Sequence, residues 1–128
     1  MTTVYRILTG AEWRRAQAAG AITPNALDQA SGFLHLSGEA QLLETAARYF
    51  PPETRPVALE LDADALGEAL KWEPVASRGG ARFPHLYLAE LPLTHVHAVT
   101  SLRALATGAY ALSARVPRAG TPNTSGER

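Results

Sequence analysis

The residues of this sequence that could do chemistry are polar side chains embedded in apolar stretches, and His35 is the central one. Residues 31–37 read Ser-Gly-Phe-Leu-His-Leu-Ser, which predicts a short buried strand over residues 33–36. A helical pattern follows at once, so we expect Ser37 or Gly38 to cap that helix. An imidazole beside the positive end of a helix can hold an anion. The alternative interpretation is a core histidine bonded to a backbone carbonyl.

Other polar residues share this setting. Arg6 lies in a β-branched and aromatic run, on the face opposite its two neighbours, and His85 and Tyr87 share one face of a predicted strand at residues 83–88. A buried charge is costly unless it is paired or lines a pocket, so each charged residue needs a partner. For Arg6 one candidate partner is Glu60, and the alternative is that these polar side chains converge on one cleft.

Two further histidines, His95 and His97, are spaced to share a strand face. A metal site there is conceivable, but two ligands alone are weak evidence, and an exposed edge strand is the simpler interpretation. The sequence contains no cysteine, which excludes disulfides, thiolate metal sites and cysteine nucleophiles. We therefore expect no bound metal.

Composition narrows the classes of function further. The chain has 128 residues, 46% of them hydrophobic and 19% charged, which is typical of one soluble domain. Its 12 basic and 12 acidic residues balance, which argues against a general nucleic-acid binder but leaves a local basic pocket open. No apolar run is long enough for a signal peptide or a membrane span, so we expect a cytoplasmic protein. The sequence does not determine the oligomeric state.

Two helices should position these residues. Thr9 and Glu12 form a capping box, which predicts a helix that ends before Gly20, and apolar residues at helical spacing predict a second helix over residues 39–50. Residues 21–30 look like a loop with at most one helical turn. Short strands account for most of the rest, so the expected fold class is α+β.

The strand-forming segments alternate with polar and glycine-rich turns. Extended structure is predicted for residues 3–8, 33–36, 57–61, 69–73, 83–88 and 91–102. Residues 103–116 favour neither helix nor strand, because alanine supports a helix and Gly108 opposes it. We expect one globular domain over residues 1–116 and a disordered tail over residues 117–128.

Five of these segments together resemble the uncharacterised bacterial domain-of-unknown-function family 952. They read Val-Tyr-Arg-Ile (4–7), Gly-Phe-Leu-His-Leu-Ser (32–37), Ala-Leu-Glu-Leu-Asp (58–62), Lys-Trp-Glu-Pro (71–74) and Phe-Pro-His-Leu-Tyr (83–87). The resemblance covers residues 4–100 and implies an ADP-ribosyltransferase-like fold, with short strands in a split, strongly bent sheet and two main helices. The segment order is similar to the catalytic lobe of the tRNA 2′-phosphotransferases.

This resemblance implies a cleft that binds NAD or a related ADP-ribose-type nucleotide as a substrate. Arg6 would neutralise the pyrophosphate, His35 would bond a phosphate or ribose, and Ser37 would donate to the nicotinamide carboxamide. Tyr87 and His85 would line the acceptor side, with His85 as a proton-transfer group, so that His35 and His85 are the candidate catalytic residues.

The sequence also departs from the pattern of those enzymes. Arg6 stands where histidine is usual, and Ile7 and Leu8 replace a Gly-Thr pair. No residue can be assigned as the glutamate that activates the acceptor. Two hypotheses therefore stay open, a transferase-like enzyme and a non-catalytic nucleotide-binding module that lost the chemistry.

Overall fold

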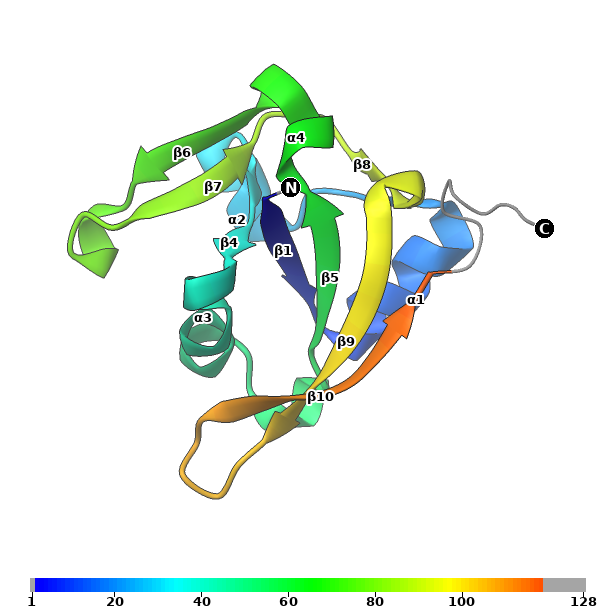
Figure 1. Cartoon of the computed structure of the whole chain (residues 1–128), viewed down its shortest axis with the longest axis vertical. Coiled ribbons are helices and arrows are strands. Elements are labelled where there is room, and N and C mark those ends of the chain that lie inside the picture. Colours follow the sequence, from blue (N-terminus) through cyan, green and yellow to red (C-terminus); the bar gives the residue numbers. More distant parts are fainter. Residues whose placement is uncertain (1, 119–128) are drawn as a thin grey trace.

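Three antiparallel sheets and four α-helices form the α+β fold of the computed structural model, which describes residues 2–118 (Figure 1). The helices are α1 (Gly10–Ala19), α2 (Ala26–Ser31), α3 (Leu42–Tyr49) and α4 (Ala63–Leu66). The strands are β1 (Thr3–Leu8), β2 (Ala21–Ile22), β3 (Leu34–His35), β4 (Ser37–Gly38), β5 (Val57–Asp62), β6 (Leu70–Pro74), β7 (Arg82–Leu86), β8 (Leu91–Pro92), β9 (Val96–Ala104) and β10 (Tyr110–Pro117). No helix within residues 2–118 is long and apolar enough to cross a membrane.

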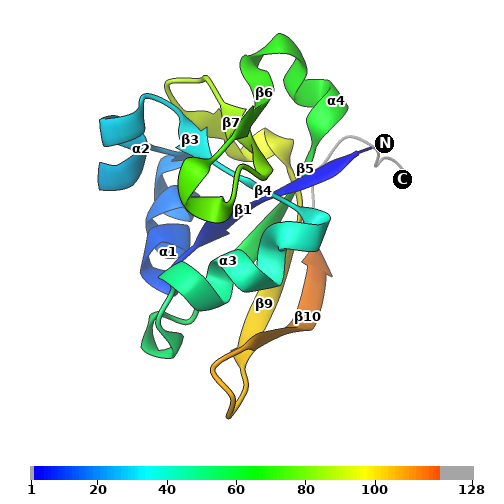
Figure 2. The ribbon, with the colours of Figure 1, turned by 90° about the vertical axis from the view of Figure 1, so that its left-hand side faces the viewer.

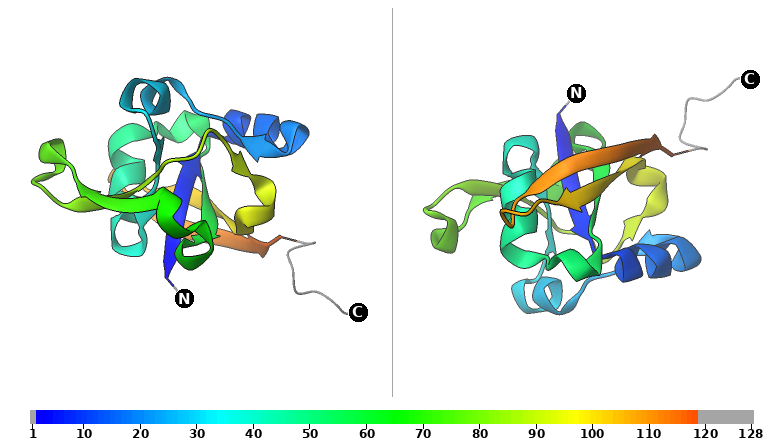
Figure 3. Two further views of the ribbon diagram at one scale, coloured as in Figure 1. Left: turned by 90° about the horizontal axis from the view of Figure 1, so that it is seen from above. Right: turned by 90° about the horizontal axis from the view of Figure 1, so that it is seen from below.

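The largest sheet has the strand order β10-β9-β5-β1-β4, and the three-stranded sheet has the order β3-β7-β6. Strands β2 and β8 form the remaining pair. Figure 3 shows the β6–β7 hairpin projecting away from the rest of the fold. Because β9 lies between β5 and β10, the expectation that His95 and His97 mark an edge strand is wrong.

The alternation of side chains along β1 separates two hydrophobic cores. Val4 and Leu8 belong to the larger core, which also contains Leu34 and Leu86 from the three-stranded sheet. Ile7 points the other way, into a smaller core shared with α3. Figure 2 shows α3 in front of the large sheet. Strand periodicity thus leaves one face of β1 turned toward the three-stranded sheet.

Helix α1 begins and ends where the sequence predicts. The Thr9 hydroxyl accepts a hydrogen bond from the Glu12 amide, and the Glu12 carboxylate accepts one from the Thr9 amide. Gly20 closes the helix with φ of 82°, a left-handed conformation that glycine adopts without strain. The prediction of this helix is confirmed.

The expected loop over residues 21–30 is wrong, because β2 and α2 lie there. Asn25 and Asp28 form a second capping box: the Asn25 side chain accepts from the Asp28 amide, and the Asp28 carboxylate accepts from the Asn25 amide. This reciprocal bonding lets a six-residue helix begin at Ala26, with Asn25 as its N-cap. Helix α2 therefore adds to the two main helices that were expected, and α4 is a further short helix.

The strand predicted over residues 33–36 is shorter in the structure, where β3 covers Leu34–His35 only and a separate strand, β4, begins at Ser37 in the other sheet. His35 in β3 pairs with β7, whereas Ser37 in β4 pairs with β1. Leu36 lies between them, and its amide donates to the Pro84 carbonyl at 3.2 Å. Gly38, not Ser37, caps a 3₁₀ turn at Glu39–Gln41 that leads into α3. The chain therefore crosses from one sheet to the other beside the imidazole.

The C-terminal part of the described chain is a hairpin of β9 and β10, which resolves the ambiguity over residues 103–116 in favour of strand. Pro117, the first residue of the predicted disordered tail, pairs with Ala98 in the sheet, and the Arg118 amide donates to the His97 carbonyl, so the prediction of disorder is wrong for these two residues. Residues 119–128 of that predicted tail lie outside the described residues.

Tyr110 connects this hairpin to the end of α3 through a hydrogen bond. Its side chain is buried, and its hydroxyl donates to the Phe50 carbonyl at 2.8 Å. We expect Tyr110→Phe to lower the free energy of unfolding by about 1–2 kcal/mol, since a partly buried carbonyl loses its donor. Urea denaturation measures this loss. Tyr49→Phe is the control, because the Tyr49 ring is half exposed. An equal effect in both variants would contradict the prediction.

Candidate functional site

A cavity of about 530 Å³ lies between the large sheet, the three-stranded sheet and helices α2 and α3. Its wall includes Arg6 from β1, His35 from β3 and His85 from β7. Tyr49 and Phe83 supply aromatic surface. Cavities of about 300–1,000 Å³ with apolar walls and a few convergent polar groups are typical of small-ligand sites. This cavity is therefore the candidate functional site.

Asp28 connects three segments of the wall through one buried carboxylate. The Arg6 guanidinium donates to both of its oxygens, at 3.1 Å and 2.7 Å. The His35 amide donates to Oδ1 at 3.0 Å, and His35 Nδ1 lies 2.7 Å from the same oxygen. Arg6 Nη1 also donates to the His35 carbonyl at 2.9 Å. Asp28 is 1% exposed, so this network fixes β1, α2 and β3 relative to one another inside the protein.

The electrostatics of this network keep Asp28 ionised. Burial alone would raise the pKa of Asp28, but the hydrogen bonds from His35 and Arg6, together with the guanidinium charge, lower it far below its ordinary value. An ionised carboxylate only accepts hydrogen bonds, so His35 Nδ1 must carry a proton. In the neutral ring, His35 Nε2 is then an unprotonated base.

A second carboxylate holds the second histidine in the same way. His85 Nδ1 lies 2.8 Å from Glu73 Oε1, and the Tyr87 hydroxyl donates to the same oxygen at 2.6 Å. The hydrogen bonds from Tyr87 and His85 lower the pKa of Glu73, and the bond to Glu73 raises the pKa of Tyr87. Glu73 thus orients His85 as Asp28 orients His35.

Both imidazoles lie on one face of the three-stranded sheet. His35 and His85 are directly opposite in the β3–β7 pairing, and their ring centroids are 6.0 Å apart. The Phe33 ring stacks on His85 with centroids 3.9 Å apart and contacts His35 at 4.6 Å. Leu34 and Leu86 occupy the other face and are buried in the larger core. The apolar face fixes the sheet, and the opposite face presents the two rings to the cavity.

Arg78 is the second arginine of the cavity wall. It lies in the turn after β6, and its guanidinium is 4.5 Å from the centre of the Phe83 ring. Its polar contacts are long: Nη1 donates to the Thr45 hydroxyl at 3.3 Å, and Nη2 lies 3.7 Å from Glu44. Arg78 therefore keeps more capacity to bind an anion than Arg6, which a buried carboxylate holds at both nitrogens.

The structure brings together most of the residues singled out from the sequence. The cavity wall contains Arg6, His35, Ser37 and His85, whereas Tyr87 lies outside it and donates to Glu73, which in turn contacts His85 of the wall.

The predicted partner of Arg6 is wrong. Glu60 lies opposite Tyr5 in the β1–β5 pairing and therefore on the other face of the sheet from Arg6. Arg6 pairs instead with Asp28 of α2, and Glu60 pairs with Arg115 of β10 at 2.8 Å. Asp28 and Arg78 were not recognised as site residues. The spacing of Asn25 and Asp28, which matches a capping box, was the available signal for Asp28. Arg78 gave no comparable signal in its glycine-rich turn.

Comparison with known proteins identifies the family. A family model described as "Protein of unknown function (DUF952)" matches residues 7–99. The chain belongs to this family. The match to the family model confirms the family that the five sequence segments resembled. Comparison with proteins of curated function finds no match.

Two solved structures show how closely the DUF952 fold is shared. The X-ray structure of protein CC0527 from Caulobacter crescentus is 44% identical, with a TM-score of 0.77, and the alignment covers 86% of this chain and 94% of that one. The solution NMR structure of CC0527 is 46% identical, with a TM-score of 0.73 and coverage of 85% and 91%. These similarities support the α+β fold described here.

Proposed function

We propose that the cavity binds an NAD- or ADP-ribose-type nucleotide and that the protein is transferase-like. The observation that carries this proposal is the combination of two oriented imidazoles, an available arginine and aromatic walls around one space of about 530 Å³. Aromatic rings suit a nicotinamide or adenine, and guanidinium and imidazole suit phosphate and ribose. A nucleotide needs both kinds of surface within one cavity.

The geometry favours Arg78 as the residue that meets the phosphates. The Arg6 charge is balanced by Asp28, and its side chain is 3% exposed. Arg6 Nε is buried and has no hydrogen-bond partner among the described residues. Arg6 would therefore contribute one donor at most, while Arg78 would supply the charge. The imidazole of His35 and the hydroxyl of Ser37 remain candidates for bonding the ribose and the carboxamide, as the resemblance implies.

The proposal includes an ADP-ribosyltransferase-like arrangement of the fold. Its support is the division of the strands into two main antiparallel sheets, with the chain passing between them at Leu36. A split, bent sheet of this kind leaves a cleft where the two parts diverge, and the cavity lies beside that crossing.

One observation favours the alternative, a nucleotide-binding module without catalysis. The described carboxylates on the cavity wall are Glu12 and Asp28, and both are occupied. Glu12 accepts from the Thr9 amide, and Asp28 accepts from Arg6 and His35. Neither is free to activate an acceptor, which is the task that a transferase gives to a carboxylate.

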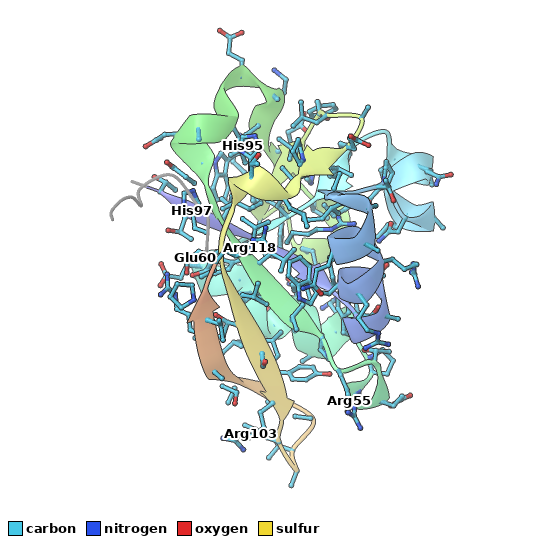
Figure 4. The ribbon with its side chains drawn as sticks, turned by 90° about the vertical axis from the view of Figure 1, so that its right-hand side faces the viewer. Arg55, Glu60, His95, His97, Arg103 and Arg118 are labelled. Carbon is cyan, nitrogen blue, oxygen red and sulfur yellow. The ribbon has the colours of Figure 1, made fainter. Side chains whose placement is uncertain are left out.

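A ligand screen by thermal unfolding tests the proposal. We expect NAD, ADP-ribose or a nucleoside 2′-phosphate to raise the unfolding midpoint, with a stabilisation of about 2.7 kcal/mol at a ligand concentration of 100 times Kd. Arg78→Ala should remove most of this gain. Arg103→Ala is the matched control, because Arg103 is exposed on the β9–β10 hairpin (Figure 4).

The same samples separate the two functions. Release of nicotinamide from NAD supports a transferase-like enzyme, whereas stabilisation without release supports the binding module. If none of these nucleotides changes the midpoint of the wild-type protein, the proposal is wrong.

A further inference from the structure

The two histidines of the cavity each have a carboxylate beside Nδ1, an arrangement that is suited to proton transfer. Each presents Nδ1 to a carboxylate, His35 to Asp28 at 2.7 Å and His85 to Glu73 at 2.8 Å. Neither Nε2 atom makes a hydrogen bond to another described residue. The buried side-chain atoms without a hydrogen-bond partner do not include either of them. Both Nε2 atoms are therefore accessible to solvent, and both residues line the cavity. Carboxylates at Nδ1 fix the ring orientation and leave Nε2 as the reacting atom.

The spacing of the rings fits one phosphoryl group. His35 and His85 are directly opposite on neighbouring strands, with ring centroids 6.0 Å apart. Two hydrogen bonds of about 2.8 Å can reach different oxygens of a phosphate held between such rings. Phe33 packs against both rings and restricts their rotation. The pair is thus preorganised to act at two oxygens of the same phosphorus centre.

The charges around the rings are close to balance. The charged and titratable groups that face them are Asp28 on α2, Arg6 on β1, Glu73 and Lys71 on β6, and Tyr87 on β7. Arg78 and Glu12 lie on the same cavity wall. A phosphate entering here meets Arg78 without displacing a short ion pair, since the contact from Arg78 to Glu44 is 3.7 Å.

We infer that His35 and His85 are a general acid–base pair that cleaves a short ribonucleotide phosphodiester. One imidazole takes the proton of the 2′-hydroxyl at Nε2, and the 2′ oxygen forms a bond to the adjacent phosphorus. The bond from phosphorus to the 5′ oxygen breaks, and the other imidazole gives its Nε2 proton to that leaving oxygen. The products are a 2′,3′-cyclic phosphate and a 5′-hydroxyl. The inference rests on the nucleotide-binding cavity proposed above and goes beyond the transferase-like activity.

The size and charge of the protein restrict the substrate to a short one. The chain has a formal net charge of zero, so it lacks the excess positive charge that would hold a long polyanion. The cavity of about 530 Å³ suits one or two nucleotides. Adenylyl-3′,5′-adenosine is an appropriate probe, and its analogue that lacks the reacting 2′-hydroxyl can bind but cannot react.

The decisive variants are His35→Asn and His85→Asn. An asparagine amide can still donate from near the position of Nδ1, so the bonds to Asp28 and Glu73 can persist while Nε2 is removed. His95→Asn is the control, because His95 lies in a 3₁₀ turn outside the cavity wall (Figure 4). Unfolding midpoints measured without nucleotide confirm that each variant is folded.

We expect the wild-type protein to form the 2′,3′-cyclic phosphate with a bell-shaped dependence of rate on pH. Each cavity variant should lower the rate about 10²-fold or more and lose one limb of the profile, whereas His95→Asn should match the wild type. Activity from a contaminating ribonuclease would remain in the variants, because they are purified in the same way as the wild-type protein. Activity that survives in the protein carrying both cavity substitutions would therefore overturn the inference.

The binding measurement distinguishes this inference from the proposed function. If the 2′-deoxy analogue raises the midpoint but the wild-type protein forms no cyclic phosphate, the acid–base pair is refuted and the nucleotide-binding cavity stands. If neither the analogue nor NAD or ADP-ribose raises the midpoint, both fail.

Discussion

Asp28→Ala is expected to lower the free energy of unfolding by about 3–5 kcal/mol, the range measured when one partner of a buried ion pair is removed. The Arg6 side chain is 3% exposed, so without Asp28 its charge stays in the interior with no carboxylate beside it. The amides of Asn25 and His35 lose their acceptor at the same time. Such a loss is a large fraction of the stability of a domain this size.

Urea denaturation at neutral pH measures this change. Asp64→Asn is the matched control, since Asp64 is exposed in α4, and we expect it to stay within about 0.5 kcal/mol of the wild type. The double variant Arg6→Met with Asp28→Leu should regain much of the stability, because it removes both charges and keeps apolar volume. A double variant as unstable as Asp28→Ala would show that packing or the unpaired amides of Asn25 and His35, and not the unpaired charge, cause the loss.

The second large effect is a loss of stability in acid that depends on Asp28. Its pKa in the folded protein lies far below the ordinary value of 3.8, so the unfolded chain takes up this proton at a higher pH than the native protein does. The stabilisation from Asp28 is complete above the unfolded pKa and is lost as the pH falls toward the folded pKa. Within that window the free energy of unfolding should fall by about 1.4 kcal/mol per pH unit from this group.

Thermal unfolding between pH 5 and the acid limit compares the wild type with the Arg6→Met, Asp28→Leu double variant. The double variant should lose less stability per pH unit below the unfolded pKa of Asp28, because it has no carboxylate to protonate at that site. Glu73→Gln provides the contrast. The pKa of Glu73 is also lowered, but Glu73 is more exposed, and we expect a smaller change in slope. Identical slopes in the wild type and the double variant would refute the assignment of the acid effect to Asp28.

Local sequence features predicted those parts of the fold that depend on neighbours in the chain. Thr9 and Glu12 lie three residues apart, and the hydrogen bonds between them fix the start of α1 without contacts from distant segments. The alternation around His35 also predicted correctly that its side chain points away from the core that contains Leu34 and Leu36. A period of two residues is enough for that conclusion once one face is buried.

Other features depend on which strands meet, and pattern alone does not contain that information. Residues 33–36 look like one apolar strand, yet β3 ends at His35, and the chain that continues into β4 at Ser37 pairs with β1 while β3 pairs with β7. Similarly, the partner of Glu60 is Arg115, which the β9–β10 hairpin brings alongside β5 from 55 residues away. Local periodicity indicates which residues share a face of a strand. It does not indicate which strand will pair with each edge or which segment will pack on each face.

The sequence by itself determined that polar residues on apolar strands would need partners or a pocket, and it identified His35, His85 and Arg6 as such residues. Only the tertiary structure decided that Asp28, 22 residues from Arg6, is the partner that neutralises it. The physical reason is that burial makes pairing necessary, while the choice of partner depends on which segments the two sheets bring into contact. The same packing placed both imidazoles against one cavity.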